Sequence, residues 1–232
     1  MRIFVTGPAG SGKSTFVREF SKFLEGKGYE VACVNLDPAT DPCFEASADV
    51  REFVRTEDVM RDYGLGVNGA LLKSMELAEK CVDALKIDAD YVLYDTPGQM
   101  EIFIYSQSGR RITEKLSDTF SAALFLVDST LAADAEGFMA AIMQNVVVSL
   151  RLSLPTLTIF TKSDVAGIDV EEVRRKLKSG GLLAELLESV EFFIDYTTIP
   201  YRTIRVSSVS GEGFEDVFAA INELFCACGD IS

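Results

Sequence analysis

The chain has 232 residues, enough for one large α/β domain, and 48% of them are hydrophobic, which allows a sizeable core. It contains no histidine, so imidazole-based catalytic triads and histidine-ligated metal sites are excluded. Its 36 acidic and 22 basic residues give a net charge of −14, which argues against a broad nucleic-acid-binding surface, because such a surface needs clustered Lys and Arg.

Short apolar segments predict strands, and helical patterns separate them. In chain order the segments are RIFVT (2–6), EVACVN (30–35), DYVLYD (90–95), ALFLVD (123–128), TLTIFT (156–161) and TIRVSS (203–208). Helices are expected at about 14–24, 49–62, 70–86, 138–152 and 213–227. Continuous apolar strands that alternate with helices predict an α/β fold, with a mostly parallel sheet flanked by helices on both faces. Ligands of such a sheet bind beyond the carboxyl ends of its strands.

The glycine-rich segment GPAGSGKS (7–14) directly follows the first strand and opens the first helix, and it matches the pattern G-x-x-x-x-G-K-[ST]. Backbone N–H groups of such a loop surround an anion at the helix N-terminus. Lys13 can reach the outer phosphates of a nucleotide, and the Ser14 hydroxyl can hold Mg²⁺. The predicted phosphate-binding residues of this segment are Gly7, Gly10, Ser11, Gly12, Lys13, Ser14 and Thr15.

The third predicted strand ends in YDTPGQ (94–99), which places a carboxylate beside the phosphate loop. Asp95 can hold Mg²⁺ through water, as a Walker-B aspartate does. Gly98 can offer its N–H to a terminal phosphate, and Gln99 can orient an attacking water. The position of this segment after a predicted strand favours these roles over an ordinary turn.

The fifth predicted strand ends in TKSD (161–164), where a base is expected. Asp164 can accept hydrogen bonds from the N1–H and 2-amino groups of guanine, which adenine does not offer, so a carboxylate there discriminates between the two bases. Lys162 can cover the base, and SSVSGEG (207–213) can offer backbone N–H groups to the guanine oxygen. The predicted guanine-binding residues are Thr161, Lys162, Asp164, Ser207, Ser208 and Val209.

The segment GLGVNG (64–69) matches the dinucleotide-binding pattern G-x-G-x-x-G, but the preceding residues RTEDVMRDY are polar and predict no strand. Since that pattern binds a pyrophosphate only where a strand leads into a helix, the dinucleotide interpretation is weak. A glycine-rich turn between two helices is a second interpretation.

Taken together, these segments resemble the P-loop GTPases and, more narrowly, the GPN-loop GTPases of the SIMIBI class. The resemblance covers nearly the whole chain, because the phosphate loop, NLDPA (35–39), DTPGQMEIF (95–103), TKSD and SSVSGEG occur in order. It implies a GTP-hydrolysing homodimer that uses Mg²⁺, formed by one domain over 1–232 with a helical insertion at about 49–72. Family members are implicated in the assembly of RNA polymerase, so the resemblance also implies a protein client.

By this resemblance, Gly66, Val67 and Asn68 form a loop that each subunit pushes into the active site of its partner, with Asn68 near the outer phosphate. Val67 stands where the family name has proline, so the loop lacks a residue that fixes φ. Asp37 matches an aspartate that binds the water shell of Mg²⁺ or positions the nucleophile, and Glu101 resembles a glutamate close to the attacking water. The implied catalytic residues are Asp37, Asn68, Gln99 and Glu101, and the implied metal-binding residues are Ser14, Asp37 and Asp95.

Several alternatives stay open. A small-molecule kinase would need an Arg-rich lid, and no Arg-dense segment occurs. A GTP-binding scaffold without useful hydrolysis is kept open by Val67. A metallochaperone would need a Cys/His site, whereas Cys226 and Cys228 supply two thiolates where structural zinc takes four ligands, so we favour apolar packing for them. The helix at 138–152 is apolar on nearly every face, which favours either full burial or a partner surface.

The cysteines and the short apolar segments also predict the compartment. Five scattered cysteines without framework spacing favour a reducing cytoplasm. No apolar segment is long enough to cross a bilayer, and MRIFVTG lacks the features of a signal peptide. We therefore expect a cytoplasmic protein without membrane association.

Overall fold

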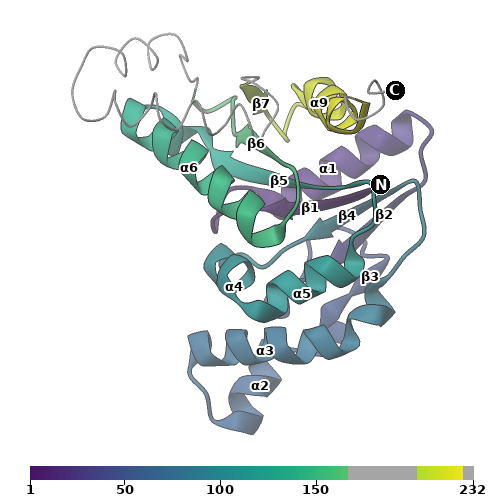
Figure 1. Ribbon diagram of the computed structural model, residues 1–232, viewed down its shortest axis with the longest axis vertical. Helices are drawn as coiled ribbons and strands as arrows, with labels where there is room; N and C mark the ends of the chain where they lie inside the picture. Colours follow the sequence, from purple (N-terminus) through teal and green to yellow (C-terminus); the bar gives the residue numbers. More distant parts are fainter. Residues whose placement is uncertain (167–202, 227–232) are drawn as a thin grey trace. The chain divides into compact units, whose positions relative to one another are not determined.

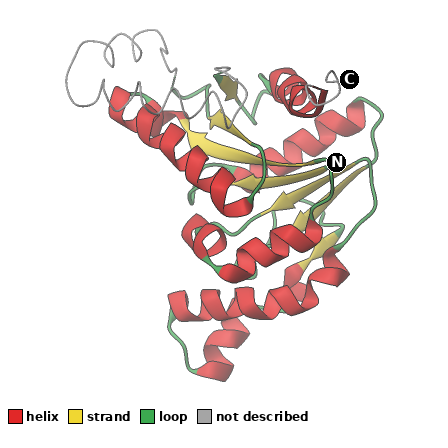
Figure 2. Cartoon of the chain, viewed as in Figure 1, coloured by secondary structure: helices red, strands yellow, loops and turns green. Residues whose placement is uncertain are grey.

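The computed structural model describes residues 1–166 and 203–226, and the chain forms two compact units, Met1–Ser121 and Ala122–Ser232 (Figure 1). Each unit combines parallel strands with helices. Figure 2 colours the strands yellow and the helices red. The α/β fold class predicted from the sequence is confirmed.

The first unit contains four parallel strands in the order β3-β2-β4-β1. Their bounds are β1 Arg2–Thr6, β2 Val31–Asn35, β3 Ala48–Asp49 and β4 Tyr91–Asp95. Asp95 at the end of β4 is in register with Val5 of β1 on one side and with Asn35 of β2 on the other. Three strands therefore end at the same level, and the segments that follow them start side by side.

Helices surround these strands. Their bounds are α1 Lys13–Gly26, η1 Val50–Glu52, α2 Thr56–Tyr63, α3 Val67–Cys81, η2 Val82–Leu85, α4 Met100–Tyr105 and α5 Gln107–Leu116. Helix α1 buries Phe16, Phe20 and Leu24, spaced four residues apart on one helical face, against the strands. Helices α4 and α5 lie on the opposite side of these strands in Figure 1.

Helices α2 and α3 form a hairpin at the lower end of Figure 1, and α3 also packs against α5. The hairpin has a small core of its own, formed by Val54, Val59 and Ala70. These apolar contacts fix the two helices to each other, and the hairpin overlaps the range of about 49–72 in which the sequence predicts a helical insertion.

The second unit contains three parallel strands in the order β5-β6-β7. Its described elements are β5 Ser121–Asp128, η3 Ser129–Ala132, α6 Ala135–Leu152, β6 Thr156–Thr161, β7 Ile204–Val206 and α9 Phe214–Cys226. Helix α6 packs on β6, where Phe138 stacks on Phe160 with ring centroids 5.5 Å apart. Met143 and Leu150 on the same helix are 42% and 61% exposed, so full burial of α6, favoured slightly by its composition, is not observed.

All six strands predicted from the sequence are present, with ends that differ by at most two residues. The helical pattern at 49–62 is interrupted, because Ala48–Asp49 form the short strand β3 and η1 precedes α2. In the described part of the chain, no helix is both long and apolar enough to cross a membrane.

Gly109 provides a test of the packing between α4 and α5. A Cβ atom at this position would lie 1.9 Å from the carbonyl oxygen of Phe103, which is backbone and cannot rotate away. We expect Gly109→Ala to lower the free energy of unfolding by about 1–3 kcal/mol, as overpacking does, measured by urea denaturation. Gly26→Ala is the matched control, since its Cβ would meet no atom within 4 Å; equal stability of the two variants would contradict the packing described here.

Candidate active site

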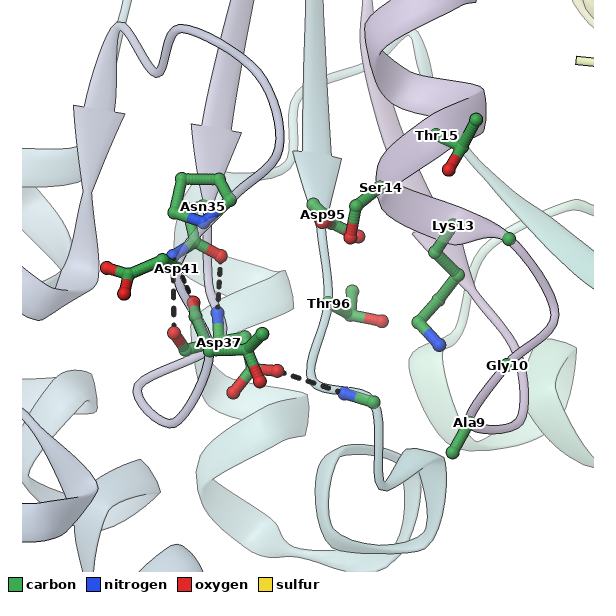
Figure 3. A pocket seen from close by; sticks show the side chains of 14 residues that line it. Ala9, Gly10, Lys13, Ser14, Thr15, Asn35, Asp37, Asp41, Asp95 and Thr96 are labelled. Atoms are coloured by element: carbon green, nitrogen blue, oxygen red, sulfur yellow. Dashed lines mark hydrogen bonds between the residues drawn. The ribbon is translucent and has the colours of Figure 1, made fainter. Parts of the chain in front are cut away.

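A pocket of about 240 Å³ lies in the first unit where β1, β2 and β4 end (Figure 3). Residues assigned a role from the sequence form more than half of its wall: Gly10, Gly12, Lys13, Ser14, Thr15, Asp37, Asp95 and Gly98. Other wall residues had no assigned role: Ala9, Asn35, Thr40, Asp41, Pro42 and Thr96. The shared level of the strand ends brings these distant segments together.

The phosphate loop has the backbone geometry that its glycines permit. Gly10 and Gly12 adopt φ values of 78° and 88°, in the left-handed region that favours glycine. Gly12 is also the N-cap of α1, and no side chain caps this helix. The positive end of the helix dipole therefore faces the loop, which suits an anionic ligand.

Lys13 is buried, and its Nζ donates to the carbonyl oxygens of Gly7 at 2.9 Å and Pro8 at 3.0 Å. Burial lowers the pKa of Lys13, while the carboxylates of Asp95, Asp37 and Glu101 act in the opposite direction. The ammonium group is thus held by the loop itself, beside the cavity in which a phosphate would lie.

Asp95 is 3% exposed, and burial raises its pKa to about 6, although a hydrogen bond from Ser14 and the charge of Lys13 oppose this shift. Its Oδ1 is buried and has no hydrogen-bond partner among the described residues. A divalent cation would satisfy this oxygen, and the hydroxyl of Ser14 supplies a second hard ligand of the kind that Mg²⁺ prefers. The residues present therefore fit Mg²⁺.

In the described part of the chain, no group of three or more cysteine or carboxylate side chains is arranged to hold a metal ion. A magnesium ion at Ser14 and Asp95 would thus need further oxygen ligands. Phosphate oxygens and water supply these in nucleotide-dependent sites. Of Cys226 and Cys228, for which the sequence favours apolar packing, Cys226 is the last described residue and Cys228 lies outside the described residues.

Asp37 follows β2 and is mostly buried. Its Oδ1 accepts from the N–H of Ala39 at 2.9 Å, and its Oδ2 accepts from the N–H of Gly98 at 3.3 Å (Figure 3). Gln99 is the N-cap of α4 and Glu101 lies in its first turn. Both are exposed and neither lines the pocket, although the charge of Glu101 acts on Lys13.

The resemblance predicts a loop at 66–68, but in the structure this segment is the start of helix α3. Gly66 is the N-cap, and Val67 and Asn68 lie in the first turn. The physical reason is that the chain reverses within Gly64–Gly66, where Gly64 closes α2 with a φ of 62°. All three residues of the predicted loop are exposed, and none lines the pocket of its own chain.

The candidate base-binding residues lie in the second unit. Thr161 of β6 is in register with Val206 of β7, and the N–H of Ser163 donates to the carbonyl of Val206, so the segments 161–164 and 207–213 start beside each other. Asp164 is exposed, and Ser207 is buried. Ser208 and Val209 lie in the turn that follows β7.

Lys162 is held by a residue that the sequence did not single out. Its Nζ lies 2.6 Å from Oδ2 of Asp128, the last residue of β5. Partial burial opposes ionisation, but Lys162 and the N–H of Thr130 keep the pKa of Asp128 below its usual value. An aspartate at the end of the strand, followed by Ser-Thr, is a typical helix-capping signal and could have indicated this residue.

A glycine-rich loop between a strand and a helix, with a buried lysine, a serine and a strand-ending aspartate around one pocket, defines a P-loop nucleotide-binding protein. A family model described as "Conserved hypothetical ATP binding protein" matches residues 5–227. The chain is 32% identical to GPN-loop GTPase PAB0955 of Pyrococcus abyssi, covering 100% of both chains. It is 35% identical to GPN-loop GTPase QQT1 of Arabidopsis thaliana, covering 90% of this chain and 80% of that one.

Comparison with solved structures gives the same family. The crystal structure of PAB0955, described as a GTPase in apo form from Pyrococcus abyssi, superposes with a TM-score of 0.82 at 30% identity and covers 98% of each chain. The chain therefore belongs to the GPN-loop GTPase family.

Asp95→Asn is expected to stabilise the protein at neutral pH in the absence of nucleotide and Mg²⁺. Burial raises the pKa of Asp95 from 3.8 to about 6. The contribution of the protonated Asp95 to the free energy of unfolding is therefore complete below the unfolded pKa and is lost as the pH rises through about 6. The ionised group then costs roughly 2–3 kcal/mol. The variant should melt about 5 °C or more above the parent near pH 7.5, with the difference shrinking toward about pH 4.5.

Differential scanning calorimetry over this pH range measures the effect. Asp164→Asn is the control, because Asp164 is exposed and its replacement should leave the melting temperature unchanged. If the melting temperature of Asp95→Asn is at or below that of the parent near pH 7.5, burial of the ionised Asp95 carboxylate does not destabilise the protein.

Proposed function

We propose that the chain binds GTP with Mg²⁺ and hydrolyses it to GDP and phosphate. The observation that carries this proposal is the convergence of Lys13, Ser14 and Asp95 on one pocket at the strand ends. Membership of the GPN-loop GTPase family and the GTPase named among the solved structures support the same activity.

In this proposal, the pocket residues bind and orient the triphosphate. The backbone of the phosphate loop and Lys13 hold the phosphates, and Ser14 and Asp95 hold Mg²⁺. The metal ion, when bound, neutralises charge on the phosphate oxygens. Phosphoryl transfer to water needs mainly positioning, so Asp37, Gln99 and Glu101 act by placing the attacking water rather than as strong bases.

The bond between Asp37 and Gly98 gives the pocket a means to distinguish GTP from GDP. The N–H of Gly98 donates to Oδ2 of Asp37 at 3.3 Å. The outer phosphate of GTP competes for this N–H, and GDP has no such group. The segment that carries Asp37 therefore responds to the state of the nucleotide, as switch segments of GTPases do.

The base preference rests on Asp164. The family model is described by ATP binding, whereas the relatives are named GTPases. The exposed carboxylate of Asp164 lies two residues after Lys162, which Asp128 holds. It can accept from both the N1–H and the 2-amino group of guanine, and adenine offers no such pair of donors. We therefore assign GTP rather than ATP as the substrate.

We further propose a homodimer in which Asn68 of one subunit completes the site of the other. Asn68 does not line the pocket of its own chain and is exposed at the start of α3. Tyr63, Val67 and Leu72 around it are about half exposed, and such apolar side chains favour a contact surface. The family resemblance supports a switch that assists the assembly of a protein complex, and the five scattered cysteines favour a reducing cytoplasm as its compartment.

A GTP-binding scaffold without useful hydrolysis is the second candidate, and the residue at position 67 favours it. Val67 is the first residue of α3, where proline is favoured because its fixed φ suits the start of a helix. Its absence leaves the placement of Asn68 less constrained than in a chain with proline at this position.

Asp164→Asn tests the base assignment. The amide offers a donor where guanine also donates, so we expect the ratio of GTP to ATP affinity to fall at least about tenfold, measured by competition against a fluorescent GDP analogue. Glu212→Gln, at an exposed carboxylate of the neighbouring turn, is the control and should keep the selectivity. An unchanged ratio in Asp164→Asn would remove the base assignment.

Asn68→Ala tests hydrolysis across the dimer. We expect turnover of GTP to fall at least about tenfold with GDP affinity within about threefold of the parent, because Asn68 acts only near the outer phosphate. Lys13→Ala should also be inactive, because its own phosphate pocket is lost. Mixing the two inactive variants should restore activity, since a mixed dimer contains one pocket with Lys13 that receives Asn68 from the other subunit.

With random pairing, half of the dimers are mixed and each has one complete site out of two, so activity should recover to about a quarter of the parent value. Mixing each variant with itself is the control. No recovery in the mixture, with dimers present by light scattering, would show that Asn68 does not act in the site of a partner.

A further inference from the structure

Asn35, the last residue of β2, uses its whole side chain to connect parts of the first unit. It is 1% exposed and lines the pocket. Its Oδ1 accepts from the N–H of Asp37 at 3.0 Å, and its Nδ2 lies 3.2 Å from the carbonyl of Asp37 and 3.4 Å from that of Thr40 (Figure 3). The same Nδ2 lies 2.9 Å from Oδ1 of Asp49.

These contacts account for the position of a polar residue at the end of the apolar strand VACVN. A buried carboxamide is costly unless its donors and acceptor are paired, and here both ends are paired with the protein. The side chain is therefore committed to holding the chain, while Asp37, two residues on, presents its carboxylate at the pocket.

Asn35 also reaches the insertion. Asp49 is the N-cap of η1, and its Oδ1 accepts from the N–H of Arg51 at 2.9 Å. A second hydrogen bond joins the same two regions, because the N–H of Thr56 at the start of α2 donates to the carbonyl of Pro38 at 3.0 Å.

A third tie is electrostatic. The buried guanidinium of Arg51 forms an ion pair with Asp41, which also lines the pocket. The segment 36–41 is thus fixed at both ends to the residues that lead into the hairpin α2–α3 and to Asn68.

We propose that Asn35 is a positioning residue for GTP hydrolysis. It fixes Asp37 in the pocket, and it transmits a displacement of Asp37 through Asp49 to the insertion. This inference rests on the proposed function. Asn35 touches no reacting atom in this role. It determines where Asp37 lies and couples the state of the pocket to the helices that carry Asn68.

The kinetic test uses Asn35→Asp, which keeps the size of the side chain and an acceptor for the N–H of Asp37. It removes the donors to three oxygens and places a charge beside Asp49. We expect kcat to fall at least about tenfold, as misplacement of catalytic groups does, with the affinity for GDP within about threefold.

The double variant Asn35→Asp/Asp49→Asn restores the bridge with donor and acceptor exchanged, and it should recover part of the lost kcat. A double variant no better than Asn35→Asp, or an unchanged kcat in Asn35→Asp, would overturn the proposal. Asn145→Asp is the matched control, since Asn145 is equally buried in α6 and donates to the carbonyl of Thr156. It should lower the melting temperature and spare kcat.

A second measurement does not depend on turnover. In Asn35→Ala, hydrogen–deuterium exchange should become faster in peptides that cover 36–41 and 49–56 and stay unchanged in α1. Faster exchange throughout the chain would mean that Asn35 supports only the fold, and unchanged exchange in 49–56 would remove the link to the insertion. If the parent protein does not hydrolyse GTP, the proposed function fails, whereas the exchange result still decides whether Asn35 joins the two regions.

Discussion

The register of β4 against its two neighbours is the constraint on which the candidate site depends. Asp95 is paired with Val5 on one side and with Asn35 on the other, so the phosphate loop, the Asp37 segment and the turn at Gly98 leave the strands at one level. A shift of one residue would turn Asp95 to the opposite face of the strands, because side chains alternate along a strand. The register of the paired strands therefore determines which side chains meet in the pocket.

Burial and opposite charges act against each other in this pocket. Lys13 and Asp95 are both buried and each is shifted towards its neutral form by burial, although their opposite charges counteract the shift. Asp37 adds a second carboxylate, which Gly98 and Ala39 stabilise by backbone hydrogen bonds. A triphosphate would place negative charge beside Lys13, and a divalent cation would place positive charge beside Asp95 and Asp37. The cost of burying Asp95 is thus the basis of its use as a metal ligand, since a well-solvated carboxylate would gain less from the ion.

The strands and helices with strong periodicity can be predicted from the sequence. The phosphate loop can be predicted as well, because its backbone geometry requires glycines at fixed spacing. The sequence is insufficient where tertiary contacts decide. Strand β3 has two residues and no alternation to detect, yet it brings Asp49 to Asn35. The resemblance to the family predicts a loop at 66–68, whereas packing of Ala70 into the core of the hairpin extends α3 back to Val67. The pairing of Lys162 with Asp128 joins residues 34 positions apart.

The helical start of α3 also changes the meaning of valine at position 67. In a flexible loop, the loss of proline would release φ and leave Asn68 free to move. Asn68 instead lies in the first turn of a helix of fifteen residues, in which Ser74 donates to the carbonyl of Ala70 and Leu71 and Met75 are buried. Helical hydrogen bonds and this packing restrict φ at the start of the helix, where proline would restrict it covalently. We infer that the hairpin, as well as the residue at position 67, determines how firmly Asn68 is presented, and that the connection of the hairpin through Asp49 and Thr56 to the Asp37 segment links that presentation to the pocket.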